Sequence, residues 1–298
     1  MEIVKAKTGF CYGILRAYKQ INELVEQEFS VYVGHKCKVE HKNNEWDVFY
    51  RIEKRDPVLL ANFPNLERVK VVHDFDTLSH GDHLVVGHHG LMAELMTDLI
   101  DRGVIIHNFK CPFIKKMDEI SETLASEGYN LIAFGKPGNH HCLYSRMAAE
   151  RVGRVCLISE DAALILKEIG QSDQKWACVG QVTGNVNSWN DFAEQLKVAD
   201  IDVRIIDTVC ADSHARQAEA IAIAKEAEAV IVVDDGGGAS TSIFETCAAI
   251  NSNTYRIGSH ATLPEGWDSK ITKIGIVGGI LVPTWVIDQT AQDLMTQI

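Results

Sequence analysis

Several features that mark particular classes of protein are missing from this 298-residue sequence. No uninterrupted run of about 18 apolar residues occurs, so we expect no membrane-spanning helix. The opening stretch, MEIVKAKTGFCYG, lacks the long apolar segment of a signal peptide, which predicts a cytoplasmic protein. Basic residues form no stripe, and 29 Lys and Arg against 41 Asp and Glu give a net charge of −12. We therefore expect neither a nucleic-acid partner nor a membrane partner.

Closely paired cysteines are also missing. The sequence holds eight cysteines, but none forms a CxxC pair, so it lacks the patterns typical of a zinc ribbon or a thioredoxin-like site. A disulfide framework is not expected in a chain of cytoplasmic character. An isolated cysteine is most simply interpreted as a small buried apolar residue. The eight are Cys11, Cys37, Cys111, Cys142, Cys156, Cys178, Cys210 and Cys247.

Three of these cysteines share a sequence setting that the others lack. The segments EIVKAKTGFC, GVIIHNFKCP and DVRIIDTVC are short runs rich in β-branched residues, each ending at or beside a cysteine. Each is followed by a stretch with apolar residues at helical spacing and many good helix formers. Because Cys11, Cys111 and Cys210 are also almost equally spaced along the chain, the sequence predicts three related units.

Strand-like apolar runs alternate with helix-like stretches in every third of the chain. FSVYVG, YNLIAFG and AVIVVDD are examples. Buried runs of this kind, with helices between them, predict parallel sheets that are covered on both faces. We therefore expect an α/β fold of three related lobes in a pseudo-threefold arrangement, each a small, mostly parallel sheet with flanking helices. The expected boundaries are residues 1–108, 109–206 and 207–298.

The three cysteines follow predicted strands, and ligands of open α/β sheets bind beyond the carboxyl ends of strands. Three lobes around one centre would bring the thiolates of Cys11, Cys111 and Cys210 to one place, and thiolates favour soft metals. A structural zinc site takes four ligands, and an iron–sulfur cluster normally takes four cysteines. Three thiolates on a cubane leave one iron open to a substrate. The sequence therefore suggests a central iron–sulfur cluster with chemistry at iron.

The motifs GFCYGILRA, NFKCP and DTVC resemble the three cysteine motifs of the LytB/IspH family, and the resemblance extends through GHHG to KIGIVGGILVP. Members of that family are 4-hydroxy-3-methylbut-2-enyl diphosphate reductases, with three α/β lobes around a 4Fe-4S cluster that has one open iron. They remove a hydroxyl group from an allylic diphosphate with two electrons and protons. The resemblance implies that Cys11, Cys111 and Cys210 are the cluster ligands. It also implies a ferredoxin or flavodoxin as electron donor, and no flavin or nicotinamide motif is visible in the sequence.

The residues that bind substrate in the family are matched only in part. Its AHG motif resembles VVGHHGLM, which implies a substrate-binding role for His89, with His88 beside it. Its first histidine, which precedes an asparagine, is matched by His41 or by His35 in VGHKCKVEHKNN, and His41 fits better. A threonine of the family's QTT stretch resembles Thr183 in QVT.

The family's GHxxHPE motif, which carries a histidine and a catalytic glutamate, is altered here to FGKPGNHHCLYS. Aligned without a gap, Asn139 takes the place of the histidine and His141 that of the glutamate. A slip of one residue instead puts His140 and Cys142 in those places. Neither alignment keeps a carboxylate, but a histidine can donate protons near neutral pH.

The third lobe departs further from the family. Its SSN triplet, at the start of a helix, corresponds to Gly238, Ala239 and Ser240 in AVIVVDDGGGAS. Backbone N–H groups of a Gly-rich turn can hold an anion, but Asp234 and Asp235 stand just before it and would repel phosphate. A further family serine, in an AGAS-AP motif, corresponds to an apolar residue in VGGILVP, which offers phosphate no hydrogen bond. That residue is Leu281.

The cluster half of the site is therefore expected to be intact, while the diphosphate half is changed. We predict an iron–sulfur reductase that removes a hydroxyl or another leaving group from a small substrate, in a pocket rich in imidazole and less selective for anions. Two alternatives stay open: a 4-hydroxy-3-methylbut-2-enyl diphosphate reductase of isoprenoid synthesis with an atypical pocket, and a non-catalytic redox or sensor protein. We expect a monomer or a homodimer. The predicted site contains His140, His141 and Thr183 as catalytic residues, and His41, His89, Asn139, Gly238, Ser240 and Leu281 as substrate-binding residues.

A zinc site is a further alternative. His35, Cys37 and His41 form an H-x-C-x₃-H pattern that is compact enough to hold a metal, although no fourth ligand is evident. Metal analysis separates this alternative from the iron–sulfur hypothesis.

Overall fold

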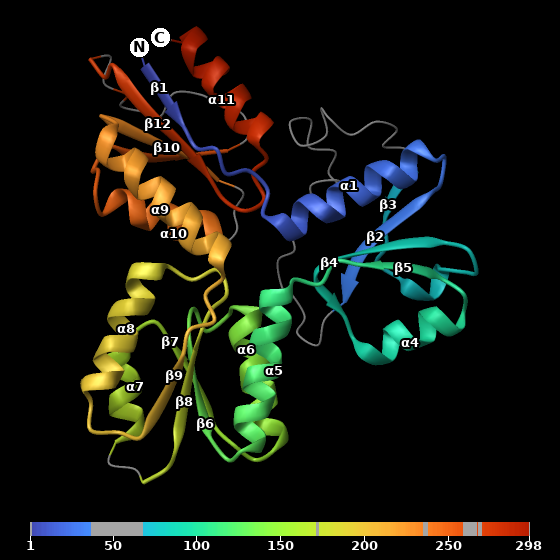
Figure 1. Ribbon diagram of the computed structural model, residues 1–298, viewed down its shortest axis with the longest axis vertical. Helices are drawn as coiled ribbons and strands as arrows, with labels where there is room; N and C mark the ends of the chain where they lie inside the picture. The colour runs from blue at the N-terminus through green and yellow to red at the C-terminus, as the bar shows by residue number, and fades with distance from the viewer. Residues whose placement is uncertain are drawn as a thin grey trace. The chain divides into compact units, whose positions relative to one another are not determined.

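The computed structural model describes residues 2–36, 68–170, 173–234, 238–258, 267 and 270–297. These residues form three four-stranded sheets in which every pairing is parallel (Figure 1). Helices flank each sheet, so the expected α/β fold with three lobes of parallel sheet is confirmed. The chain divides into two compact units, Met1–Cys111 with Ala218–Ile298, and Pro112–Gln217. None of the described helices is long and apolar enough to cross a bilayer.

The first lobe has its sheet in the strand order β3-β2-β4-β5. Neighbouring residues of β4 point to opposite faces, so Val85 packs in the core under helix α1, while Leu84 and Val86 pack with Leu99 of helix α4. This two-sided burial explains why the sequence shows a continuous apolar run here and no polar alternation. The elements are α1 (Tyr12–Glu26), β2 (Val31–Lys36), β3 (Val69–Val71), η2 (Phe75–Thr77), β4 (His83–Leu91), α4 (Ala93–Asp101) and β5 (Ile105–Asn108).

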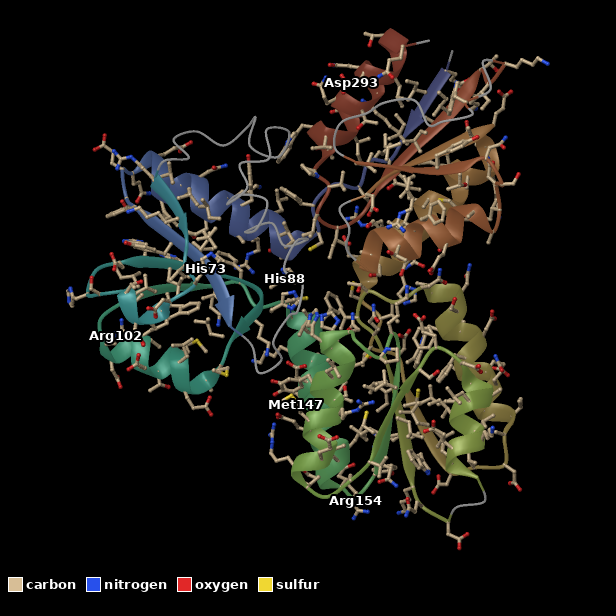
Figure 2. The ribbon with its side chains drawn as sticks, turned by 180° about the vertical axis from the view of Figure 1, so that it is seen from behind. His73, His88, Arg102, Met147, Arg154 and Asp293 are labelled. Carbon is tan, nitrogen blue, oxygen red and sulfur yellow. The ribbon has the colours of Figure 1, made fainter. Side chains whose placement is uncertain are left out.

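One arginine ties two segments of this lobe together. Arg102, just after α4, donates hydrogen bonds to the backbone carbonyls of Phe75, Asp76 and Leu78 in and after η2. Arg102, which is labelled in Figure 2, also pairs with Asp98 one turn earlier in α4, at 3.0 Å. A planar guanidinium has enough donors to satisfy several carbonyls at once, which fixes the turn before β4.

The second lobe, in the order β7-β6-β8-β9, is a three-layer unit with helices on both faces of its sheet (Figure 1). Its core gathers large side chains such as Phe134 of β6 with Trp189 and Phe192 of α8. Helices α5 and α6 lie on the other face. The elements are α5 (Pro112–Ser126), β6 (Asn130–Phe134), α6 (His140–Arg151), β7 (Cys156–Ser159), α7 (Ala162–Ile169), β8 (Trp176–Gly180), α8 (Val186–Val198) and β9 (Val203–Ile206).

The third sheet, in the order β1-β12-β10-β11, combines the start of the chain with its end. β1 pairs with β12, with Ile3 opposite Ile274. On one face, the absence of a side chain at Gly275 lets Ile223 of α9, and Ala227 just after this helix, approach β12 closely. The elements are β1 (Glu2–Lys5), α9 (Ala211–Glu226), β10 (Ala229–Val233), α10 (Gly238–Ala248), β11 (Thr254–Ile257), β12 (Lys273–Gly278) and α11 (Thr284–Gln297).

The N-terminal strand β1 belongs to a different sheet from the one that the expected lobe boundaries imply. The boundaries 1–108, 109–206 and 207–298 assign β1 to the first lobe, but its hydrogen bonds join it to the sheet of the C-terminal strands. The sheets otherwise follow chain order, with β2 to β5, β6 to β9 and β10 to β12. Local sequence patterns reveal a strand without revealing its partner, so this pairing across the chain was not visible in advance.

Candidate functional site

Cys11, Cys111 and Cys210 occupy the same local position in their lobes. Each follows an edge strand of a sheet, β1, β5 or β9, and each directly precedes the first residue of a helix, α1, α5 or α9. The expectation that the cysteines lie beyond the carboxyl ends of strands therefore holds in all three cases. The sequence led to this placement because each β-branched run and each helical stretch was visible in the local pattern.

A hydrogen bond of one type fixes the backbone at each of the three cysteines. The cysteine N–H donates to a carbonyl on the neighbouring strand's segment, beyond the last residue paired with the edge strand. Three lobes thus repeat one arrangement of strand, cysteine and helix. The bonds are Cys11 N to Ile280 O (3.2 Å), Cys111 N to His88 O (2.9 Å) and Cys210 N to Val182 O (2.9 Å).

Three predicted site residues fall at one repeated position. His89, Thr183 and Leu281 each come directly after the residue whose carbonyl accepts the cysteine N–H. Through these bonds the backbone places His89 beside Cys111, Thr183 beside Cys210 and Leu281 beside Cys11. The structure therefore brings each of them close to one of the candidate ligands.

Two of these thiols are less buried than those of the interior cysteines. Cys11 and Cys111 are half-buried, while Cys210 is buried, and its sulfur lies 3.3 Å from the N–H of Ser213, which it accepts, and 3.1 Å from the Ser213 hydroxyl. Burial, by contrast, raises the pKa of Cys156 and of Cys247 to about 12. A thiol with so high a pKa is protonated at neutral pH and is a poor metal ligand.

Two more cysteines belong to the core of the second lobe. Burial also raises the pKa of the Cys178 thiol well above its usual range. The pKa of the Cys142 thiol is raised as well, and burial is the largest cause. The Cys142 sulfur lies 3.7 Å from the carbonyl oxygen of Phe134 in β6. The alignment that puts Cys142 in the place of the family glutamate thus assigns that role to a core residue.

Asn139, His140 and His141 form the start of helix α6. Asn139 is the N-cap, and its side-chain oxygen accepts the N–H of His141 at 2.9 Å, which satisfies one of the open donors of the helix. The His140 and His141 rings lie 4.0 Å apart, close to perpendicular, and His141 is 4% exposed. The second lobe therefore presents two adjacent imidazole rings at the start of α6.

A second imidazole pair lies near the end of strand β4. The rings of His88, which is labelled in Figure 2, and of His89 are 3.9 Å apart and tilted, and both side chains are half-buried. Gly90, which follows them, has a φ of +83° in the left-handed region that favours glycine. A Cβ there would lie 2.8 Å from the Cδ atom of Lys110, so glycine also makes room for that lysine next to Cys111. His41, Cys37 and the side chain of His35 lie outside the described residues.

Thr183 lies in the loop between β8 and α8. Its hydroxyl accepts a hydrogen bond from the side-chain amide of Gln181 at 3.3 Å, and the residue is half-buried. This contact helps to orient the hydroxyl in the loop next to Cys210.

The third lobe uses its polar groups in a way that the sequence did not reveal. Helix α10 begins at Gly238, and the fully buried Ser240 donates its hydroxyl to Asp234 at 2.7 Å. Asp234 also pairs with Arg256 at 2.7 Å, which compensates the carboxylate charge. Leu281 is 5% exposed and packs in the apolar core beneath helix α1.

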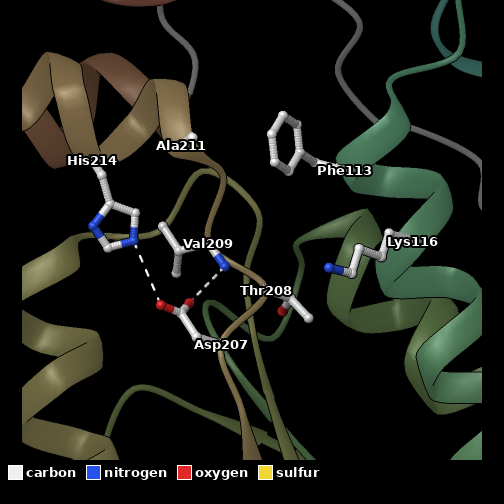
Figure 3. A pocket seen from close by; sticks show the side chains of 7 residues that line it. All are labelled: Phe113, Lys116, Asp207, Thr208, Val209, Ala211 and His214. Carbon is white, nitrogen blue, oxygen red and sulfur yellow. Dashed lines mark hydrogen bonds and ion pairs between the residues drawn. The ribbon is translucent and has the colours of Figure 1, made fainter.

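A pocket in the Pro112–Gln217 unit was missed by the sequence reasoning. It has a volume of about 360 Å³ and opens beside Cys210, between the first turns of α5 and α9 (Figure 3). Asp207 accepts the N–H of Val209 at 2.9 Å, and its other oxygen lies 3.6 Å from the Nε2 atom of His214. The signal was present as an Asp and a His flanking the cysteine in DTVCADSH. The lining residues are Phe113, Lys116, Asp207, Thr208, Val209, Ala211 and His214.

These features define a class before any comparison: an α/β protein of three parallel-sheet lobes, each with a cysteine at the start of a helix. The family model described as "LytB protein" matches residues 3–295, and the chain belongs to this family. The family expectation, and with it the expectation of an oxidoreductase, is confirmed.

Curated relatives are similar to this chain over nearly its full length. A 4-hydroxy-3-methylbut-2-enyl diphosphate reductase of Geobacter metallireducens is 25% identical, over 98% of this chain and 96% of its own. The reductase of Syntrophotalea carbinolica, with the same name, is 26% identical over 98% of both chains.

Two solved structures share the fold. One, of (E)-4-hydroxy-3-methyl-but-2-enyl diphosphate reductase, superposes with a TM-score of 0.61 at 21% identity and covers 99% of both chains. The other, of the E-1-hydroxy-2-methyl-but-2-enyl-4-diphosphate reductase of Plasmodium falciparum, has a TM-score of 0.71 at 16% identity and covers 98% of this chain and 86% of its own.

Proposed function

We propose that this chain is an iron–sulfur reductase in which Cys11, Cys111 and Cys210 hold a 4Fe-4S cluster, with the three lobes around it. The observation that carries the proposal is the repeated setting of the three cysteines, each between an edge strand and a helix with the same type of backbone hydrogen bond. The donor set fits the group, because thiolates suit iron and the Cys210 sulfur already accepts an N–H. When bound, such a cluster supplies electrons and an open iron position.

The substrate side supports a changed substrate. Leu281 stands where the lobe repeat places Thr183 in the second lobe, and it contributes an apolar side chain in a buried position. Ser240 donates its hydroxyl to Asp234, so that hydroxyl is already engaged within the lobe. A multiply charged diphosphate would be underpaired by such groups, which lowers its affinity steeply. The proposed reaction is therefore removal of a hydroxyl from a small substrate with less negative charge.

Proton delivery in this proposal falls to the second lobe. The Thr183 hydroxyl is oriented by Gln181 and lies beside Cys210, where it can pass a proton to a bound group. The His140 and His141 rings are the proposed proton donors in place of a carboxylate, since histidine is a common general acid. His89 would bind the polar end of the substrate, with His41 as a further candidate. Asn139 and Gly238 complete the proposed binding residues.

The second candidate is the reaction named for the relatives, reduction of 4-hydroxy-3-methylbut-2-enyl diphosphate. Two observations favour it. The similarity covers essentially the full length of reductases with this name. In addition, the Arg256 guanidinium lies 2.7 Å from Asp234, so this carboxylate does not present an uncompensated charge to a phosphate at the start of α10.

The proposed location is the cytoplasm, with a ferredoxin or flavodoxin as electron donor and a monomer or homodimer as the working form. A non-catalytic redox or sensor protein is the remaining alternative. It predicts a stable cluster whose electron paramagnetic resonance spectrum does not change with any small hydroxy compound.

One assay separates the candidates. Protein with its cluster reconstituted is mixed anaerobically with a reduced viologen and 4-hydroxy-3-methylbut-2-enyl diphosphate. We expect no dye oxidation while the absorbance of the cluster stays intact, and turnover only with hydroxy compounds that lack the diphosphate. Rapid oxidation with the diphosphate would establish the second candidate. Failure to bind iron at all would overturn the proposal in both forms.

A further inference from the structure

Arg16 is held between two aromatic rings next to the first candidate cluster ligand. Its guanidinium carbon lies 5.6 Å from the centre of the Tyr12 ring and 5.3 Å from the centre of the Phe109 ring. Tyr12 directly follows Cys11, and Phe109 lies two residues before Cys111. The three side chains, which we call the Tyr12–Arg16–Phe109 surface, thus join the segments of two candidate ligands.

This surface is open and positively charged. Tyr12 is 71% exposed, although it is a large aromatic side chain, and Arg16 is exposed as well. Among the described residues, Arg16 forms these two ring contacts and no ion pair, so its charge is not compensated. Stacking on the rings also restricts the side chain, so that less entropy is lost when its N–H groups bind a partner.

The sequence around the surface has one sign of charge. Residues 7–22 and 108–117 each contain three basic residues and no acidic one, in a chain whose net charge is −12. Lys19 is exposed one turn after Arg16 on α1. A nearby carboxylate, Glu219, is engaged by the backbone N–H groups of Lys7 and Thr8. A basic area on an acidic protein steers an acidic partner to that place and away from the rest.

We propose that the Tyr12–Arg16–Phe109 surface, with Lys19, is the docking site of a small acidic protein that carries one electron at a time. The inference rests on the proposed function, because Cys11 and Cys111, which neighbour Tyr12 and Phe109 in the chain, would then be ligands of the electron acceptor. In each docking event the reduced carrier would give up one electron to the oxidised cluster that these cysteines would hold, and a second docking event would supply the second electron. Exposed Tyr and Arg are also the residue types that contribute most to binding at protein interfaces.

The charge of Arg16 can be tested by binding alone, without any turnover. Dye-labelled flavodoxin with oxidised flavin is titrated with the full-length protein, and binding is followed by fluorescence anisotropy. We expect R16E to weaken binding about tenfold or more at low salt, and R16K to keep most of it, because like charges repel across an interface. Lys167 is an exposed lysine on α7 that belongs to the other compact unit and is not one of the residues of this surface, so K167E is a matched charge reversal that should bind like the wild type.

Electron transfer supplies the second readout. Reduction of the reconstituted cluster by reduced flavodoxin should slow in R16E and in K19E, while reduction by dithionite, a small molecule, stays at the wild-type rate. The wild-type rate with flavodoxin should fall with added salt, and the R16E rate should depend on salt much less.

Two results would overturn the docking proposal. One is an R16E variant that binds flavodoxin, and is reduced by it, as well as the wild type. The other is a wild-type protein that shows no measurable binding of flavodoxin at low salt. Loss of the cluster in the wild type is a different failure. It would refute the proposed function while leaving the binding result to be judged separately.

Discussion

Leu281 takes, beside Cys11, the position that Thr183 takes beside Cys210. In both lobes the preceding residue accepts the cysteine N–H through its carbonyl, from Ile280 in one case and from Val182 in the other. The lobe repeat therefore offers a hydroxyl next to one candidate ligand and an isobutyl group next to another. This difference between equivalent positions is a direct structural reason to expect an unusual substrate.

Replacing Leu281 by serine tests that reason. L281S should bind 4-hydroxy-3-methylbut-2-enyl diphosphate or inorganic pyrophosphate more tightly than L281A, because only serine adds a hydrogen-bond donor at this position. Both variants lose a buried leucine and should be destabilised by about 2–5 kcal/mol. The pair is therefore matched in cavity and differs in the hydroxyl. Equal affinities of the two variants, measured by calorimetric titration, would remove Leu281 from the binding site.

The three candidate ligands should differ sharply from the interior cysteines. C11S, C111S and C210S should each lose most of the iron bound after anaerobic reconstitution, because serine does not replace a thiolate on iron. C156S, at a buried site with a high thiol pKa, should keep its iron and lose only some stability. Iron and sulfide content per chain measures both. Full iron content in C111S together with loss in C156S would show that the ligands are assigned wrongly.

Thr183 should matter for the rate more than for the fold. T183V keeps the shape and removes the hydroxyl near Cys210, so we expect the rate constant for turnover to fall about 10²–10⁴-fold, as for loss of a positioned proton donor. T183S retains the hydroxyl and serves as the control. The measurement needs the substrate that the dye assay identifies. If T183V and T183S turned over equally fast, the hydroxyl would have no part in proton delivery.

A histidine pair on the first lobe makes stability depend on pH. His107 lies 3.1 Å from the Nδ1 atom of His83, and its pKa is lowered first by burial and then by repulsion from His83. The folded state thus binds this proton less readily than the unfolded chain, so stability is full above the ordinary histidine pKa and falls as the pH drops below it. H107Q should show a smaller drop in melting temperature between pH 7.5 and pH 5.5 than the wild type.

The exposed His80 supplies the control for that experiment. H80Q should reproduce the wild-type dependence on pH, because this exposed side chain has no part in the His83–His107 pair. A wild-type melting temperature that stayed constant over this range would contradict the prediction.

The sequence alone was sufficient to predict the helices and strands and to place three cysteines just after strands. Runs such as AVIVV are apolar along their whole length because both faces of the sheet are covered, and the helices between them show their own period. From these two signals the position of Cys11, Cys111 and Cys210 beyond strand ends followed. The same motifs gave the resemblance to the family that the comparison confirmed.

What the sequence did not reveal depends on contacts between distant segments. The pairing of β1 with β12 joins residues that are far apart in the chain, and no local pattern encodes a partner. For the same reason it did not predict that Leu281 packs under α1, or that Ser240 donates to Asp234 while Arg256 compensates the charge. From the sequence, Leu281 and Ser240 could be interpreted only as differences from the family motifs, because their contacts in the folded protein were not known.

The most direct test of the account is metal analysis with Mössbauer spectroscopy of the protein purified without oxygen. The account predicts about four iron and four sulfide ions per chain, with one iron site distinct from the other three because it lacks a cysteine ligand. About one equivalent of zinc with no iron would contradict it, and would move attention to the pattern formed by His35, Cys37 and His41.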